Sequence, residues 1–274
     1  MPRRRSGVAM VEVAGLRSWG LIDLAAATPL APLVGQLARR GIAHCLFEGP
    51  LDPALQQVCP YIVDMAAAPE LGARWRDEGG ACAWGVMFDS ALPSHLARRH
   101  VRRLLQVRLP DGSGPVLLRL WDPRVLRPML EQADCVWHDA LFRDVAAYWI
   151  EEGAQLVRWP AAQYAAPGSR HRGILTVTLA QQEALARRQR QALAARLEAE
   201  TGGQTRADRF VGYIAEAIRA GAIMERDAAA LSLLLAAADC RGRPPAVDEL
   251  LADRTVPGAL KVFQVRHALG QAER

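Results

Sequence analysis

Acidic side chains follow five of the short apolar runs in this 274-residue sequence: Asp23, Glu48, Asp64, Asp89 and Asp122. Catalytic and metal-binding carboxylates gather at strand ends in α/β folds, so a metal-dependent hydrolase is one interpretation. The alternative is that these side chains cap helices and accept hydrogen bonds from turn amides. No histidine or second carboxylate lies at a short ligand spacing from any of them, which favours the structural interpretation.

The other reactive residue types form no familiar catalytic motif. His95 and His100 are five residues apart, which misses the i, i+4 spacing of two ligands on one helix face. Ser90 and Ser94 lack the G-x-S-x-G context of a nucleophile elbow. The cysteines have no CxxC spacing and lie in apolar contexts, so we expect small core residues in a reducing compartment. They are Cys45, Cys59, Cys82, Cys135 and Cys240.

Arginines mark one face of a predicted helix at residues 92–103. Arg98, Arg99, Arg102 and Arg103 fill the sector opposite an apolar face. Such a basic stripe suits an acidic protein surface or nucleic acid, and a solvated helix face is an equal alternative. Nucleic acid is the weaker version, because no aromatic residue interleaves the stripe to stack on a base.

Short apolar runs alternate with helical patterns between residues 17 and 160, which predicts an α/β N-terminal lobe. A Leu109-Pro110-Asp111-Gly112 turn joins two runs as a hairpin, so we expect a mixed α+β sheet. The predicted strands are 19–22, 43–47, 61–63, 82–88, 104–109, 116–121, 147–150 and 155–159, and the predicted helices are 30–40, 69–78, 92–103 and 123–132.

The second half of the chain has a different pattern. Segment 161–173 carries Pro, Gly and Ser without periodicity, so we predict an α/β domain at 1–165 and an all-α domain at 166–274. Thr178 and Gln181 form a capping box that opens a long helix ending near residue 200.

Composition describes an ordinary soluble globular protein of one large or two smaller domains. The net charge is +5, and nearly all the cations are arginine, so an acidic partner is permitted. Glu12 interrupts the short apolar run near the start, so we expect no signal peptide. No stretch approaches the roughly 20 apolar residues of a membrane span.

Seven short motifs occur in a fixed order along the first half of the chain. They are Trp19-Gly-Leu-Ile-Asp23, Cys45-Leu-Phe-Glu-Gly49, Pro60-Tyr-Ile-Val63, Trp84-Gly85, the arginine-rich helix, Val107-Arg-Leu-Pro-Asp-Gly112 and Trp121-Asp-Pro-Arg-Val-Leu126. The series resembles the bacterial type VI secretion adaptor or effector-chaperone family. Its signature residues are Asp23, Glu48, Trp84, Asp122, Pro123 and Arg124.

The resemblance implies a cytoplasmic, non-enzymatic protein without cofactor or metal. It implies two partners, a cognate toxic effector and a VgrG-type spike protein, and neither nucleic acid nor membrane. The arginine stripe Arg98–Arg103 is our candidate partner-binding surface. We also predict that Asp122 caps a helix that has Pro123 in its first turn, and that Arg124 reaches a carboxylate, with Glu48 the first choice.

Overall fold

The structure, a computed structural model, describes residues 15–47, 49, 52, 55, 58–78, 83–152, 155–161 and 173–270. The chain forms two compact units, Met1–Leu185 and Ala186–Arg274, which divide within the long helix α7 (Leu179–Glu200). The predicted boundary at 165/166 and nearly all of the predicted linker 161–173 lie outside the described residues.

The first unit is built on a six-stranded sheet in the order β2-β3-β1-β4-β7-β8. Every neighbouring pair in it is antiparallel. The strands are β1 (Arg17–Asp23), β2 (Ala43–Cys45), β3 (Pro60–Asp64), β4 (Gly85–Ser90), β7 (Ala147–Glu152) and β8 (Gln155–Pro160). The predicted α+β class is therefore confirmed, but the main sheet is antiparallel and not mixed.

A second sheet of three strands has the order β6-β5-β9. β5 (Gln106–Arg108) and β6 (Val116–Leu117) form the predicted hairpin, and Gly112 takes the positive φ of +76° that its turn requires. β9 (Leu175–Thr176) pairs with β5 in parallel. This short strand is an exception to our expectation that the chain after residue 165 is helical.

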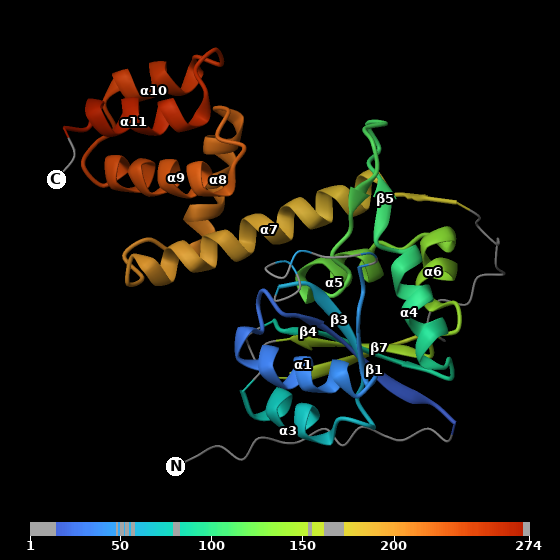
Figure 1. Cartoon of the computed structure of the whole chain (residues 1–274). Helices are drawn as coiled ribbons and strands as arrows, with labels where there is room; N and C mark the ends of the chain where they lie inside the picture. The colour runs from blue at the N-terminus through green and yellow to red at the C-terminus, as the bar shows by residue number, and fades with distance from the viewer. Residues whose placement is uncertain are drawn as a thin grey trace. The chain divides into compact units, whose positions relative to one another are not determined.

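Helices cover both faces of the main sheet, because its strands alternate their side chains between two apolar cores. Trp19 and Leu21 of β1 join one core, whereas Ile22 joins the other. Figure 1 shows α1 and α3 together on one side of the main sheet. The helices on this side are α1 (Ala31–Arg39), which follows the 3-10 turn η1 (Thr28–Leu30), and α3 (Pro69–Glu78). The core that contains Trp19 includes residues of α4 (Ser94–Arg103), α5 (Pro123–Glu131) and α6 (Cys135–Phe142).

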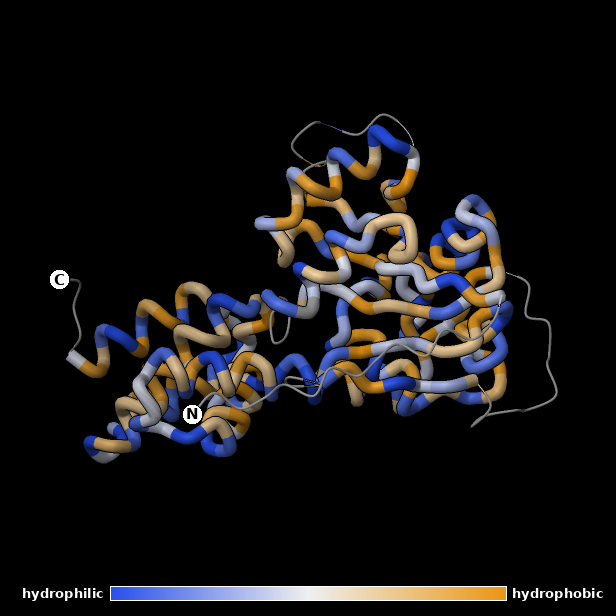
Figure 2. The backbone as a smooth tube through the Cα atoms, turned by 90° about the horizontal axis from the view of Figure 1, so that it is seen from below, coloured by the Kyte–Doolittle hydropathy of each residue, from blue (hydrophilic) through white to orange (hydrophobic). Residues whose placement is uncertain are grey.

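The regular secondary structure in the described residues of the second unit is all helical, as predicted. The capping box is also confirmed, since Thr178 and Gln181 exchange hydrogen bonds of 2.9 and 3.2 Å at the start of α7. Figure 2 shows hydrophobic and hydrophilic residues interspersed along these helices, which share one apolar core. They are α8 (Ala207–Arg219), α9 (Glu225–Asp239), α10 (Pro245–Ala252) and α11 (Gly258–Ala268).

Lys261, the only lysine in the sequence, is fully buried in the second unit. Its ammonium group donates hydrogen bonds to the carbonyl oxygens of Ala220, Leu251 and Asp253 at 2.6, 3.3 and 2.7 Å. These carbonyls lie at the ends of α8 and α10, where helices leave acceptors without helical partners. One cation on α11 therefore satisfies the ends of two other helices.

Candidate functional site at one end of the sheet

The predicted strand-end carboxylates divide between the two ends of the main sheet. β1 and β4 are antiparallel, so Asp23 at the end of β1 lies at the opposite end from Asp89, which pairs with Ser18. Asp64 lies with Asp89, since its register partner is Trp19. Glu48 lies outside the described residues. The convergence that a carboxylate-based metal site requires is therefore not found among the described members of the set.

Each described carboxylate also has a structural role. Asp89 accepts hydrogen bonds from the Ser18 hydroxyl and the Trp149 indole, both at 2.7 Å. Asp64 accepts the backbone amide of Ala66 at 3.1 Å in the turn after β3. No group of three or more His, Cys, Asp or Glu side chains that could hold a metal ion occurs in the described part of the chain. The geometry therefore favours a structural interpretation of these residues, although Asp89 bonds two side chains and serves neither a cap nor a turn.

Several of the sequence motifs meet at the end of the sheet where β1 finishes. Antiparallel pairing brings the end of β1, the end of β2 and the starts of β3 and β4 to this edge. The residues placed there include Asp23, Cys45, Cys59 and Trp84, which come from four separate motifs or their flanks. We call this region the sheet-end surface, and its further members are Phe47, Arg98, Arg119 and Trp121, together with the Asp122–Arg124 pair that directly follows Trp121.

Asp23 and Arg119 form the central ion pair of the sheet-end surface, with 2.6 Å between the carboxylate and the guanidinium group. The Asp23 side chain is 5% exposed, whereas the Arg119 side chain is 47% exposed. Arg119 also lies over the ring of Trp121, 6.0 Å from its centroid, and Trp121 meets Phe47 edge-on at 6.1 Å. The buried acid thus holds a half-exposed cation against an aromatic pair.

The Asp122-Pro-Arg motif starts a helix as predicted, but the strand predicted at 116–121 already ends at Leu117. Asp122 caps α5 by accepting the backbone amide of Arg124 at 2.9 Å, and Pro123 occupies the first turn. The Arg124 guanidinium reaches a carboxylate, and that carboxylate is Asp122 itself, at 2.8 Å. The exposure again differs between the partners, at 7% for the Asp122 side chain and 56% for Arg124. The first-choice partner, Glu48, lies outside the described residues.

Trp84 and Gly85 hold the start of β4 close to the end of β1 at this end of the sheet. The carbonyl of the buried Trp84 accepts the amide of Asp23 at 2.8 Å. A Cβ atom on Gly85 would lie 1.9 Å from the carbonyl oxygen of Leu21, so no other residue fits there. The Trp84-Gly85 motif therefore fixes the position of Asp23.

The arginine stripe of α4 is not one uniform solvated face, because its four side chains differ in exposure. Arg98 is half-buried and donates hydrogen bonds to the carbonyl oxygens of Cys45 and Phe47, at 2.8 and 3.1 Å. These carbonyls belong to the outer strand β2 and the residues after it, so Arg98 covers part of a free sheet edge. Arg102 is also half-buried, whereas Arg99 and Arg103 are exposed. Partner binding by these four residues stays a prediction.

Two features of this region were not predicted, namely the role of Arg119 and the proximity of Cys45 to Cys59. Arg119 lies 96 residues from Asp23 and belongs to no motif that we had singled out. Cys45 and Cys59 have sulfur atoms 3.0 Å apart, although their spacing matches no known cysteine motif. Their positions relative to the strands could have indicated this proximity, because Cys45 ends β2 and Cys59 directly precedes β3, the antiparallel neighbour of β2. Cys135 and Cys240 are exposed, so the prediction that they are core residues was wrong.

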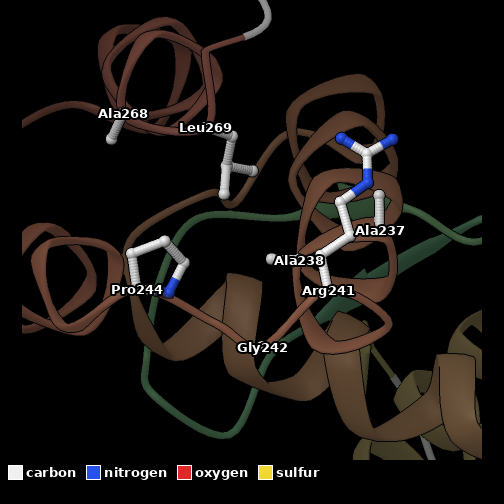
Figure 3. Close-up of a pocket in the computed structure, with 7 residues that line it drawn as sticks. All are labelled: Ala237, Ala238, Arg241, Gly242, Pro244, Ala268 and Leu269. Atoms are coloured by element: carbon white, nitrogen blue, oxygen red, sulfur yellow. The ribbon is translucent and has the colours of Figure 1, made fainter.

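A separate hollow occurs in the second unit, between the end of α9 and the end of α11. Figure 3 shows its lining, which includes Arg241, Pro244 and Leu269. The remaining lining residues are alanines and one glycine. Arg241 is its one ionisable side chain, and the lining contains neither a nucleophile nor an acid–base pair.

The first unit therefore defines an α+β domain with an arginine-rich and aromatic sheet end. Residues 18–138 match the model of a family described as Domain of unknown function (DUF4123). The matched segment runs from β1 into α6 and includes every described member of the sheet-end surface. Comparisons with curated proteins and with solved structures found no match. Among the helices of the described residues, none is both long and apolar enough to cross a membrane.

Proposed function

We propose that the chain is a type VI secretion effector chaperone or adaptor, which binds a cognate toxic effector in the cytoplasm and helps to load it onto a VgrG-type spike. The observation that carries the proposal is the meeting of its motifs at the sheet-end surface. Segments that resemble the adaptor family are distant in sequence, yet they form one continuous chain of contacts from Arg98 through Phe47, Trp121 and Arg119 to Asp23.

The charge arrangement of this surface suits protein recognition. In the Asp23–Arg119 and Asp122–Arg124 pairs the acid is buried and the arginine is about half-exposed. The charge that a partner meets is therefore positive, although each pair is neutral as a whole. A guanidinium group that is already held in place loses less conformational freedom when it binds a carboxylate or carbonyl of a partner. Arginine and aromatic side chains are also the types enriched at binding hot spots.

Proteins of the family that the chain resembles are encoded beside their toxic effectors, so the test is co-expression with the protein encoded by the gene next to that of this chain. The chain should raise the amount of that protein in the clarified lysate and should co-purify with it and with the spike. Arg124→Ala should weaken recovery at least ten-fold, since it removes a half-exposed cation while Asp122 still caps α5 through the backbone amide. An effector that is equally soluble and stable without the chain would overturn the proposal.

Two further double variants test whether binding depends on the α4 arginines in particular or on the positive charge of the chain in general. The double variant Arg99→Glu/Arg103→Glu tests the exposed half of the α4 stripe, and its effect should appear mainly in the association rate and depend on salt. The matched control is Arg206→Glu/Arg254→Glu, which makes the same charge change at exposed positions of the second unit. Tight DNA or RNA binding without any protein partner would favour the nucleic-acid alternative instead.

A further inference from the structure

Two thiols of the sheet-end surface, those of Cys45 and Cys59, lie in contact in an arrangement that the proposed function does not use. Cys45 is the last residue of β2, and Cys59 directly precedes β3. These strands pair antiparallel, and the amide of Leu46 donates to the carbonyl of Pro60 at 2.9 Å, so the pairing continues past Cys45. The two sulfur atoms lie 3.0 Å apart and are not joined by a disulfide bond. The fold, and not the sequence spacing, brings them together.

The two thiols have unequal environments. Cys59 is buried, whereas Cys45 is half-buried and reaches solvent. A hydrogen bond from the Cys59 thiol lowers the pKa of Cys45 to about 7, with further help from the Phe47 amide and the charges of Arg98 and Arg102 against the opposing effect of burial. The same hydrogen bond and burial raise the pKa of Cys59. One thiol is therefore prepared to react, and its neighbour keeps its proton.

We propose that Cys45 and Cys59 form a redox-active dithiol that exchanges with low-molecular-weight disulfides, Cys45 attacking first and Cys59 closing the bond. The order of the two steps follows from the solvent accessibility and the ionisation of the two thiols. A thiolate, not a thiol, attacks a disulfide, and Cys45 is the more accessible and the more ionised of the two. Cys59 already touches the sulfur that it must attack in the second step.

The exchange balances with a small disulfide, written RSSR, as the oxidant. The Cys45 thiolate attacks one sulfur of RSSR, a mixed disulfide forms on Cys45, and RS⁻ leaves and takes a proton from water. Cys59 then gives its proton to water, its sulfur attacks the Cys45 sulfur, and the second RS⁻ leaves and is protonated. The protein loses two electrons and two protons, and RSSR becomes two RSH molecules. The product joins the end of β2 to the residue before β3.

The experiment uses the full-length chain in buffers of reduced and oxidised glutathione, followed by acid quenching, alkylation and mass spectrometry. A glutamyl endopeptidase cleaves after Glu48, which lies between the two cysteines, so peptides that contain Cys45 and Cys59 stay together only through a disulfide. We expect this linked species in oxidising buffer and its loss in reducing buffer. If both thiols remain open to alkylation in the most oxidising buffer, the proposal is overturned.

A variant separates the two steps. Cys59→Ala removes the closing thiol, so the mixed disulfide with glutathione should accumulate on Cys45, whereas the wild-type chain should hold little of it. The same variant should move the pH midpoint of Cys45 alkylation upward from about 7, because the hydrogen bond that stabilises the thiolate is gone. Cys135→Ser is the matched control, since it removes an exposed cysteine and should change neither readout. An unchanged midpoint together with no trapped glutathione would also overturn the proposal.

Discussion

The pH dependence of folding should carry the signature of one buried histidine, His100 on α4. Burial lowers the pKa of its imidazole from 6.5 to about 4 in the folded chain; Asp144 acts in the opposite direction, whereas Arg103 and Arg143 add to the lowering. The unfolded chain returns the imidazole to an ordinary value near 6.5. Between these two pKa values the unfolded state binds a proton that the folded state does not bind.

The free energy of unfolding should therefore fall as the pH drops from about 6.5 to about 4, and this group should have no effect above 6.5. The difference between the two pKa values corresponds to a loss of about 3 kcal/mol in the free energy of unfolding once the pH has fallen from 6.5 to 4. Carboxylates titrate in the same range, so the histidine contribution must be isolated by a variant.

His100→Asn is the matched variant. The Nε2 atom of His100 is buried without a hydrogen-bond partner, while the ring bonds to the backbone of Leu141. An asparagine amide keeps a donor in the place of Nδ1 and does not titrate. The substitution leaves a cavity and lowers stability at every pH, so the comparison concerns the slope with pH and not the absolute value.

The assay is urea unfolding at a series of pH values, followed by tryptophan fluorescence. All seven tryptophans lie before residue 186, so the signal reports on the first unit alone. Wild type should lose about 3 kcal/mol more than His100→Asn between pH 7 and pH 4. Parallel loss of stability in the two proteins across this range would refute the reasoning.

Three substitutions test structural roles described above. Asp122→Ala removes the cap of α5 and should lower the free energy of unfolding by about 1 kcal/mol in the same fluorescence assay; an unchanged value would contradict the cap. Gly85→Ala places a methyl group against the Leu21 carbonyl and should cost more than the roughly 1–3 kcal/mol of ordinary overpacking, so a melting temperature like that of wild type would contradict the close approach. Lys261→Met leaves three carbonyls without their donor and should cost about 3 kcal/mol, measured as urea unfolding by circular dichroism, and an unchanged midpoint would count against that role.

Local features were predictable from the sequence because their physical causes are local. The cap at Asp122 and the capping box at Thr178 each depend on residues two or three positions apart. The apolar stripe of α4 was equally readable, since Ala97 and Val101 lie one turn apart and both are buried. Helix α6 was missed because its buried side chains, which include Trp137 and His138, show no clear one-sided pattern.

Features that depend on strand order were not predictable. The role of Arg98 follows from β2 being the outer strand, which no single segment reveals. The division of the carboxylates follows from antiparallel pairing, which sends Asp23 and Asp89 to opposite ends of the sheet. β9 is only two residues long, and its pairing with β5 joins segments that lie far apart in the sequence.

The burial of Lys261 leaves the folded protein without a lysine side chain for amine-directed reagents to reach. Acylation of that amine requires the second unit to open first, because the ammonium group is enclosed by the carbonyls that it bonds. The acylation rate at Lys261 therefore measures how often the helical unit opens, and it does so at one chemically defined position. Attachment of a fluorophore or a solid support through lysine would select opened molecules, so labels for the intact protein are better directed at the exposed thiols of Cys135 and Cys240.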